Sequence, residues 1–599
     1  MSDLPRLLDL AAIRALYAGG CSVQDVIAAA ARRAEDADPS IFITRSPAAY
    51  LMAAVEALLA RAPEPGSLPL WGVPFAVKDN IDVAGLPTTC ACPAFSHVAE
   101  ADAAVVQKLI EAGAIVIGKT NLDQFATGLN GTRSPYGIPR SVFDPAFISG
   151  GSSSGSAVAV AAGIVCFSLG TDTAGSGRVP AAFNNIVGIK PTSGLLSTRG
   201  LVPACESLDC ISVFALSTAD GVTVRRLAEG YDPADPWSRI AEPRTLPRDG
   251  LRLGVLALAD RDFCGRSAHA ALYAQAIART GAEVVEIDYA PFREVAALLY
   301  EGAWVAERLA AFEDTGVSIE ALDPVVGGIF ARAASFSATD AFRGLHRLET
   351  LNRRCQAEFD KADVLLLPTA PRTFTVEEML AEPVLRNSQL GLYTNFCNLL
   401  GLSAIAVPAG FAADGLPFGV TLVGPGFADD SLARLADRVH RASDCGCATE
   451  QGTITPPLPP SADPEDRIEL VVVGAHLSDM PLNHELVALG GQLAARTRSS
   501  PEYRLFALPG TVPPKPGLVF SPGANGPGIE VEVWSMPAAG FGRFVAAIPG
   551  PLGVGRIKLA NGRSVSGFLC EQWASEGAEE CTQYGGWRAY VANRATVLS

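Results

Sequence analysis

Long apolar segments are missing from this sequence, and their absence argues against a membrane protein. The apolar run at residues 157–167 is eleven residues long, whereas a transmembrane helix needs about 20. The first residues, Met1-Ser2-Asp3-Leu4, lack the basic and then apolar pattern of a signal peptide. We therefore expect a cytoplasmic protein with no membrane partner.

Positive charge is also scarce. The chain has 47 Lys and Arg residues against 63 Asp and Glu residues, which gives a formal net charge of −16. This balance argues against a nucleic-acid partner, because polyanions bind to positively charged surfaces. A small anionic substrate is compatible with it only if a local cation lies in the binding site.

The sequence offers no metal-ligand cluster at a familiar spacing. Its 13 cysteines are an odd number scattered over 599 residues, which is typical of reduced thiols. Two close pairs, Cys90 with Cys92 and Cys445 with Cys447, have no second pair at the spacing of a zinc site. We expect no metal and no cofactor.

Composition divides the chain into three segments. Residues 1–450 alternate short apolar strands with amphipathic helices, which predicts an α/β domain with a sheet at its core. Residues 451–467 are rich in proline and have no periodic apolar face, so they are predicted to form a linker. Residues 468–599 contain strand-like runs and an Asn561-Gly562 turn signal, which predict a separate β-rich domain.

Apolar periodicity and turn residues predict individual elements in both domains. We expect helices at residues 22–34, 48–61, 103–111 and 268–280. We expect strands at residues 71–77, 114–118, 251–256, 283–287, 469–473, 528–534 and 556–559. Two further strands, at residues 362–368 and 403–408, are each expected to end at a proline, which cannot donate a hydrogen bond to a sheet.

Two glycine- and serine-rich loops, at residues 150–156 and 170–178, flank an apolar run. Glycines allow backbone N–H groups to approach a ligand closely, as an oxyanion hole requires. Ser176, near the end of the second loop, is therefore a candidate nucleophile. A phosphate-binding loop is the alternative, but its pattern needs a Lys before the Ser or Thr, and here Arg178 follows instead.

A serine nucleophile needs an adjacent base, and the nearest upstream histidine is the distant His97. Lys78 directly follows an apolar strand, where burial would lower its pKa and allow it to act as a neutral base. The alternative is a structural lysine that pairs with Asp79 or Asp82.

The two loops, taken with Lys78, closely resemble the motif of the amidase signature family. The resemblance implies an α/β amidase signature fold, in which helices flank a mixed central sheet. It also implies a triad in which Ser176 is the acyl-forming nucleophile, Ser152 is a bridging serine that follows a cis peptide bond, and Lys78 is the base. Further roles are implied for the oxyanion-hole residues Thr173, Ala174 and Gly175, and for the supporting residues Ser153, Asp172 and Arg178.

Within this family, residues 123–137 and the C-terminal domain are similar to the allophanate hydrolases, whose second domain has a γ-glutamyl-cyclotransferase-like fold. This resemblance implies that Tyr300 and Arg308, eight residues apart within a helix, hold the substrate allophanate, with Arg308 on its carboxylate. It places Gly128 in the same site. Without the resemblance, a packed tyrosine and a solvated arginine would be expected.

The same resemblance implies a role for His476, which follows an apolar strand of the second domain. There it would speed the decarboxylation of N-carboxycarbamate, the first product. The alternative is a structural histidine, which is the more common role of a lone histidine at a strand end. The resemblance also implies a homodimer, with urea carboxylase as a further partner.

Three other functions are compatible with parts of the sequence. The first is an amidase for other small amides, against which the Tyr300–Arg308 pair and the extra domain argue. The second is the glutaminase subunit of a tRNA-dependent amidotransferase, which the acidic charge and the extra domain disfavour. The third is a scaffold without catalysis, which is hard to reconcile with three intact triad positions.

Overall fold

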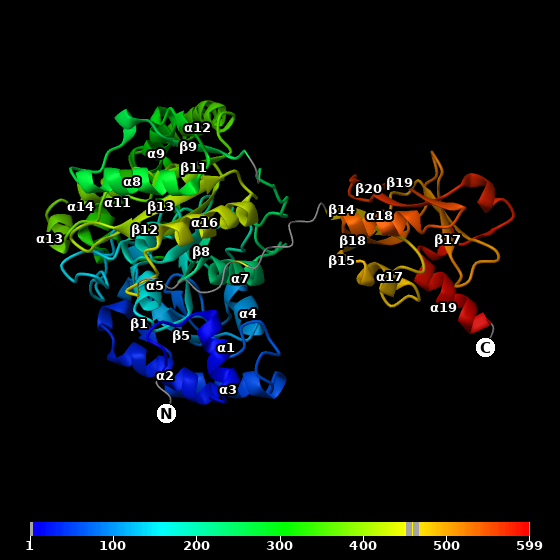
Figure 1. The fold of residues 1–599 in the computed structure, drawn as a ribbon, viewed down its shortest axis with the longest axis horizontal. Helices are drawn as coiled ribbons and strands as arrows, with labels where there is room; N and C mark the ends of the chain where they lie inside the picture. The colour runs from blue at the N-terminus through cyan, green and yellow to red at the C-terminus, as the bar shows by residue number, and fades with distance from the viewer. Residues whose placement is uncertain (1–3, 248–249, 451–457, 459–466, 598–599) are drawn as a thin grey trace. The chain divides into compact units, whose positions relative to one another are not determined.

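The computed structural model describes residues 4–247, 250–450, 458 and 467–597 (Figure 1). The chain divides into two compact units, Met1–Pro459 and Pro460–Ser599. Each unit has a hydrophobic core of its own. The predicted linker at residues 451–467 lies almost entirely outside the described residues.

The larger unit is built on a mixed sheet, which confirms the predicted fold class. In the described part of the chain its eleven strands lie in the spatial order β1 (Phe42–Arg45), β5 (Ile115–Thr120), β2 (Pro74–Lys78), β6 (Phe167–Thr171), β8 (Ile211–Ala215), β7 (Val187–Lys190), β12 (Ser403–Phe411), β13 (Pro417–Gly424), β11 (Val364–Pro368), β9 (Arg252–Leu256) and β10 (Glu283–Ile287). Strand β2 is parallel to both β5 and β6, and β9 is parallel to both β10 and β11. The other neighbouring pairs are antiparallel.

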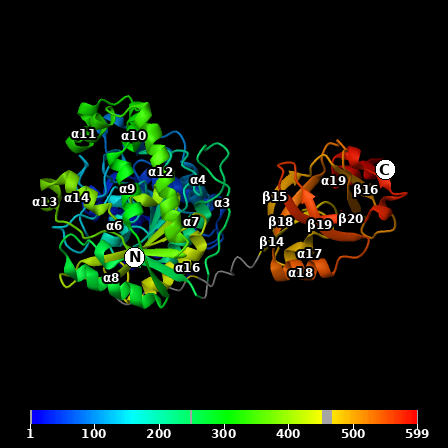
Figure 2. The same cartoon turned by 90° about the horizontal axis from the view of Figure 1, so that it is seen from above.

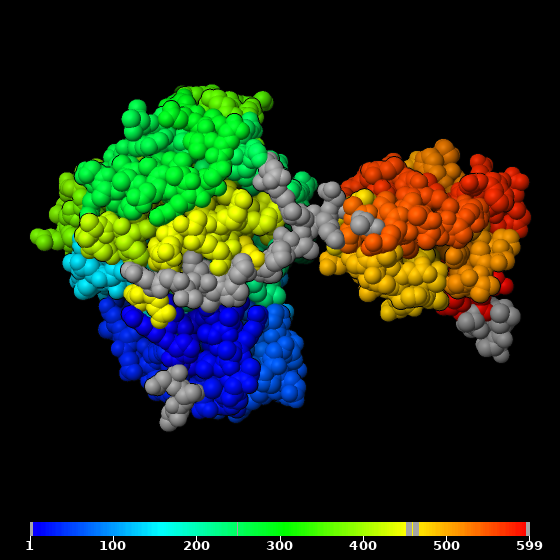
Figure 3. Space-filling model, viewed as in Figure 1, coloured from blue at the N-terminus to red at the C-terminus, as the bar shows by residue number. Residues whose placement is uncertain are grey.

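Helices lie around this sheet (Figures 1 and 2). They are α1 (Leu10–Ala18), α2 (Val23–Asp36), α3 (Ala48–Arg61), α4 (Ala104–Glu111), α5 (Ser154–Ala161), α6 (Val179–Phe183), α7 (Thr218–Ala228), α8 (Ser267–Thr280), α9 (Ala290–Glu301), α10 (Trp304–Glu313), α11 (Pro324–Ala333), α12 (Ala338–Phe359), α13 (Val376–Ala381), α14 (Pro383–Leu390), α15 (Phe396–Leu399) and α16 (Asp429–Ser443). A small hairpin joins β3 (Pro87–Thr88) and β4 (His97–Val98). The space-filling view shows the N-terminal residues in blue and the α12 region in green on opposite sides of this unit, with α16 in yellow between them (Figure 3).

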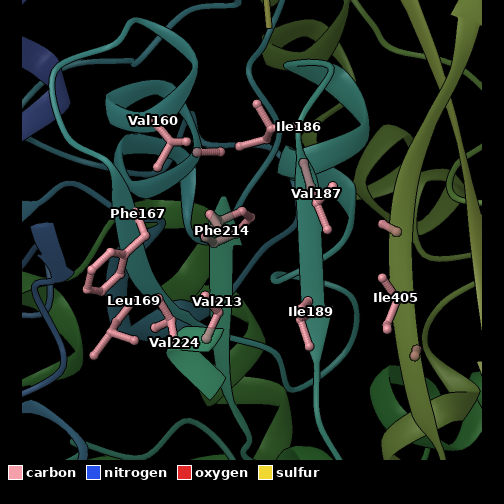
Figure 4. Close-up of a cluster of buried hydrophobic side chains, with 14 of the residues drawn as sticks. Val160, Phe167, Leu169, Ile186, Val187, Ile189, Val213, Phe214, Val224 and Ile405 are labelled. Carbon is pink, nitrogen blue, oxygen red and sulfur yellow. The ribbon is translucent and has the colours of Figure 1, made fainter. Parts of the chain in front are cut away.

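The central strands are apolar throughout because both faces of the sheet are covered. Every residue of β2, β6 and β8 is buried. Figure 4 shows Phe167 and Leu169 of β6 beside Val213 and Phe214 of β8, in the layer that α5 covers. The strand ends that carry the serine loops therefore rest on a continuous core.

Most of the predicted elements are confirmed to within a few residues. Ser22 caps α2 through its Oγ, which accepts a hydrogen bond from the backbone N–H of Asp25. One strand end was predicted wrongly, since β12 continues past Pro408 to Phe411. The register shifts between Pro408 and Gly410, and this irregularity lets the strand continue through a residue that cannot donate.

The C-terminal unit is β-rich, as predicted. One sheet has five described strands in the order β15 (Gln492–Arg498), β18 (Glu530–Pro537), β14 (Arg467–Val472), β20 (Ser564–Cys570) and β19 (Leu552–Lys558). A second sheet contains β17 (Pro516–Phe520), β16 (Tyr503–Ala507) and β21 (Glu579–Glu580). The helices are α17 (Asn483–Ala488), α18 (Ala538–Ala546) and α19 (Trp587–Val597).

Among the residues that the structure describes, no helix combines the length and the apolar character needed to cross a bilayer. All 13 cysteines are free thiols.

Candidate active site

The end of β2 and the two serine loops meet in the interior of the larger unit. Strands β2 and β6 are parallel neighbours, so Lys78 and Thr171, their last residues, lie at the same edge of the sheet. Helix α5 begins beside this edge, directly after Ser152 and Ser153. Lys78 Nζ consequently lies 2.8 Å from Ser152 Oγ and 2.6 Å from Thr171 Oγ1, and all three side chains are buried.

Burial sets the protonation of Lys78. Desolvation lowers its pKa to about 7, although Asp123, Asp209 and Asp172 act in the opposite direction. A lysine with this pKa can be neutral at physiological pH and accept a proton. The alternative of a lysine paired with Asp79 is wrong, because Asp79 instead lies 3.2 Å from Lys119 in a fully buried ion pair.

Ser152 follows a cis Gly151–Ser152 peptide bond, as the family resemblance implied. Its carbonyl oxygen accepts a hydrogen bond from the backbone N–H of Asp123. A Cβ atom on Gly151 would come within 2.3 Å of Asp123 Oδ2, so no larger residue fits in front of this serine.

Ser176 lies in the second loop and is 2% exposed. Its Oγ donates to the carbonyl oxygen of Gly128 at 3.4 Å, and no hydrogen bond joins it to Ser152 Oγ among the described contacts. The backbone N–H groups of residues 173–176 donate to no acceptor in the described part of the chain. These free donors, which surround Thr173, Ala174 and Gly175, are what an oxyanion hole requires.

Asp172 and Arg178 hold the second loop in shape. Arg178 donates to both carboxylate oxygens of Asp172 at 2.8 and 3.0 Å, and Gly177 N–H donates to one of them. Burial works against the charge of Asp172, yet Arg178 holds its pKa below the ordinary value. Ser153 Oγ donates to the carbonyl of Thr171 at 3.1 Å and accepts from its N–H at 3.2 Å, so it links the two loops.

Gly128 lies in a loop that Asp123 organises. The Asp123 carboxylate accepts backbone N–H groups from Asn130, Gly131 and Arg133. Gly128 has φ +156°, and a Cβ there would meet Asp123 Oδ2 at 2.6 Å. Only glycine therefore presents this carbonyl to Ser176.

The sequence analysis assigned no role to Asp123, Thr171 or Asp209. Asp209 accepts a hydrogen bond from Thr173 Oγ1 and from the N–H groups of Ala204 and Cys205, and it is buried. An acidic residue that opens a glycine-rich loop is a common acceptor for the N–H groups that follow it, and this was the one available signal for Asp123. Thr171 and Asp209 reach the site through strand pairing, which no local pattern reveals.

Tyr300 and Arg308 do not share one helix, which corrects the prediction. Helix α9 ends at Glu301 and α10 begins at Trp304, because the chain breaks its helical course at Gly302. Eight residues of unbroken helix would separate the two by about 12 Å along the axis. With the break, Arg308 Cζ lies 5.2 Å from the centre of the Tyr300 ring.

Arg308 is 2% exposed, so it is not the solvated arginine of the alternative interpretation. Its Nε, Nη1 and Nη2 donate to no acceptor within the described residues. Leaving such a buried charge unsatisfied costs about 3 kcal/mol or more. Burial disfavours this charge, but acidic neighbours that include Asp209 hold its pKa above the ordinary value. The same Asp209 carboxylate raises the pKa of Lys78, so both cations lie within reach of one buried group.

His476 belongs to the C-terminal unit and lies in a turn four residues after β14 ends. Its Nε2 is 2.9 Å from Glu485 Oε2. Within the described ranges, no group of three or more His, Cys, Asp or Glu residues is arranged to hold a metal ion.

Comparison with known proteins places these features in context. Residues 25–433 match the family model described as Amidase, and residues 468–592 match the model described as Allophanate hydrolase C-terminal domain. The urea amidolyase of Saccharomyces cerevisiae is 45% identical over 543 residues, which cover 88% of this chain and 30% of that protein. The chain thus spans about a third of the length of the urea amidolyases that it matches.

Two further similarities are informative. The solved structure of selenomethionine-substituted Kluyveromyces lactis allophanate hydrolase is 40% identical, covers 99% of this chain and 100% of that one, and has a TM-score of 0.73. One chain of the glutamyl-tRNA(Gln) amidotransferase of Synechococcus sp. (strain RCC307) is 35% identical over 430 residues, which cover 65% of this chain and 87% of that protein.

We predict that the reactivity of Ser176 follows the deprotonation of Lys78. Because burial lowers the pKa of Lys78 to about 7, labelling of Ser176 by a fluorophosphonate should increase as the pH rises through that value. Thr171→Val removes an acceptor at Nζ and disfavours the charged amine, so the midpoint should move to lower pH. Mass spectrometry of the labelled serine across pH measures both effects.

The matched control is Thr421→Val, since Thr421 is buried on β13 and bonds to Thr369 rather than to Lys78. Its midpoint should equal that of the unmodified chain. An unchanged midpoint in Thr171→Val would contradict the assignment of Lys78 as the base.

Proposed function

The chain belongs to the amidase family, and we propose that it hydrolyses allophanate to ammonia and carbon dioxide as a step of urea degradation. The observation that carries this proposal is the buried guanidinium of Arg308, which has no acceptor in the described protein. A substrate carboxylate would satisfy it through two parallel hydrogen bonds. The similarity to a structure named allophanate hydrolase over nearly the whole chain supports the same substrate.

Allophanate has a terminal amide and a carboxylate separated by one nitrogen. With its carboxylate on Arg308 and its plane against the Tyr300 ring, its amide carbonyl would extend toward the loop that holds Thr173 and Ser176. The Asp209 carboxylate, whose charge acts on Arg308 and which accepts from Thr173 Oγ1, supports this short separation. A neutral amide would leave Arg308 unsatisfied.

We propose a serine relay for the chemistry. Neutral Lys78 accepts the Ser152 proton while Ser152 accepts the proton of Ser176, whose Oγ attacks the amide carbonyl. Because Ser176 Oγ donates to Gly128 O in the structure, it must rotate toward Ser152 when substrate binds. The N–H groups of residues 173–176 stabilise the oxyanion. The relay then returns the proton to the leaving nitrogen, ammonia departs, and water hydrolyses the acyl-enzyme by the same path.

The first product of this reaction is N-carboxycarbamate, a dianion. We propose that the C-terminal unit assists its decarboxylation and that His476 takes part. The match of this unit to the allophanate hydrolase C-terminal domain supports its involvement.

Three alternatives remain as competing proposals. An amidase for simple amides would have no use for a buried cation, and faster turnover of simple amides than of allophanate would favour it. A glutaminase subunit fits the similarity over the amidase region, and rapid release of ammonia from glutamine would favour it. A scaffold without catalysis would leave the Lys78–Ser152 contact unexplained, and full ammonia release by Ser176→Ala would favour it.

We further propose a cytoplasmic homodimer that works with a urea carboxylase. The urea amidolyases, of which this chain matches about a third, support such a partner. Analytical ultracentrifugation of the purified chain, alone and mixed with urea carboxylase, tests the assembly.

We predict that Arg308→Ala weakens allophanate binding. Loss of charge-assisted hydrogen bonds worth about 1.5–3 kcal/mol should raise KM about 10- to 100-fold. The matched control is Arg343→Ala on α12, because the Arg343 side chain is 76% exposed. Steady-state ammonia release measures KM for both variants, and an unchanged KM in Arg308→Ala would refute the role of the arginine.

We predict that a chain lacking residues 461–599 still releases ammonia from allophanate at close to the normal rate. The reason is that Lys78, Ser152, Ser176 and Arg308 all belong to the first compact unit, which has its own core. Carbon dioxide release should become slower than ammonia release. Circular dichroism checks that the shortened chain is folded, and complete loss of ammonia release by a folded product would show that the second unit helps to build the amidase site.

A further inference from the structure

The C-terminal unit contains a pocket of about 560 Å³ that none of the preceding steps uses in full. Its walls come from α17, α18, β19 and β20, and from the turn that carries His476 (Figure 1). One part of the lining is apolar and aromatic, with Phe544 and Phe568. Another part is basic, with His476 and Lys515. A small organic anion that has an apolar leaving group would match both parts.

His476 is held in a single orientation. Its ring is stacked on Phe568, with centres 5.5 Å apart and planes 6° apart, and it meets Phe544 edge-on at 5.0 Å. Nε2 contacts Glu485 Oε2 at 2.9 Å. Nδ1 bonds to no group in the described part of the chain. A carboxylate on one ring nitrogen fixes which nitrogen remains for chemistry, so Nδ1 is the atom free to exchange a proton.

Lys515 supplies the fixed positive charge. Its ammonium group donates to no acceptor among the residues that the structure describes, although its backbone is anchored by hydrogen bonds to Thr511 and Leu508. By contrast, Lys558 of the same unit pairs with Glu502. Lys515 lies next to the His476 turn because Gly474 approaches the following proline so closely that a Cβ there would come within 2.3 Å of its ring. An unpaired lysine at a pocket is a ready site for a carboxylate.

We propose that Glu485 and Lys515 complete a second reaction site around His476, in which Lys515 binds one carboxylate of a small dicarboxylate and Glu485 positions the imidazole as a proton donor. This inference rests on the proposed function, since the dicarboxylate is the N-carboxycarbamate formed after Ser176 releases ammonia. The carboxylate that remains in the product lies on Lys515. The carboxylate that leaves as carbon dioxide lies against Phe544 and Phe568, where a charged group is poorly solvated and a neutral one is favoured.

The proposed step balances in atoms and charge. The Nδ1 proton of protonated His476 passes to the nitrogen between the two carboxylates. The bond from that nitrogen to the leaving carboxylate carbon breaks, and the carboxylate's electrons form the second C=O bond of carbon dioxide. The dianion plus one proton thus gives carbon dioxide and the carbamate monoanion, and solvent reprotonates His476. Glu485 favours the protonated imidazole, because its carboxylate opposes the effect of burial on the pKa of His476.

The test follows both products from full-length protein supplied with ¹³C-labelled allophanate. Carbon NMR reports N-carboxycarbamate and carbon dioxide, and a coupled assay reports the first ammonia. We expect Lys515→Met to slow carbon dioxide formation about 10- to 100-fold at an unchanged rate of ammonia release, and Lys515→Arg to restore most of it. Lys558→Met is the matched control and should behave like the unmodified chain, since that lysine is 56% exposed and lies outside the pocket lining.

Glu485→Gln tests the positioning role. Because its carboxylate supports protonated His476, the substitution should shift the pH dependence of carbon dioxide formation to lower pH, an effect that mere loosening of the fold would not produce. Glu485 has a side chain that is 45% exposed, so the variant should fold. His476→Gln should abolish the pH dependence.

The outcomes separate this inference from the function on which it rests. If the unmodified chain releases no ammonia from allophanate, the proposed function fails. If it releases ammonia but His476→Gln leaves carbon dioxide formation unchanged, the role of the C-terminal unit fails. If His476→Gln slows that step while Lys515→Met and Glu485→Gln match Lys558→Met, the inference about Lys515 and Glu485 is overturned.

Discussion

The burial of the Lys78 amine at the end of β2 is the constraint on which the larger unit depends. The free energy needed to charge a fully buried amine lowers its pKa to about 7, and this makes a serine relay possible without a histidine. Burial requires that β2 be covered on both faces, and the all-apolar strands β6 and β8 with α5 provide the cover. The parallel pairing of β2 and β6 then brings Thr171 to the same edge, where its Oγ1 helps Ser152 to orient the nitrogen.

Three buried carboxylates surround this amine, and any of them could protonate it fully if it were left without other partners. Each is engaged elsewhere. Asp172 is neutralised by Arg178, Asp123 accepts three backbone N–H groups, and Asp209 accepts from Thr173 and two N–H groups. The same bonds shape the oxyanion loop and the Gly128 loop, so the groups that set the charge of the base also set the geometry around Ser176. This double role explains why buried acids are retained where burial is costly.

Local patterns in the sequence were sufficient for the elements and for the triad. The helix at residues 48–61 and the cap at Ser22 follow from periodicity and from the residues that flank it, and the loop motif identifies Ser152 and Ser176. Features that depend on pairing between distant segments were not predictable. The break at Gly302, which moves Arg308 over Tyr300, depends on how α10 packs, and Pro408 is tolerated inside β12 only because the register shifts beside it. Thr171 and Asp209 reach Lys78 by strand order, which the composition of the chain does not encode.

The chemistry gives a physical reason for two sites rather than one. Hydrolysis at Ser176 needs a base that is neutral at physiological pH, and Lys78 meets this need because water and counter-charges are kept away from it. Decarboxylation of a dianion needs the opposite conditions, namely a proton donor and a fixed cation close to apolar walls. An acid strong enough to protonate the carbamate nitrogen would compete with Ser152 for the Lys78 amine if both shared one pocket. Placing His476 and Lys515 in a unit with its own core keeps the two protonation states independent.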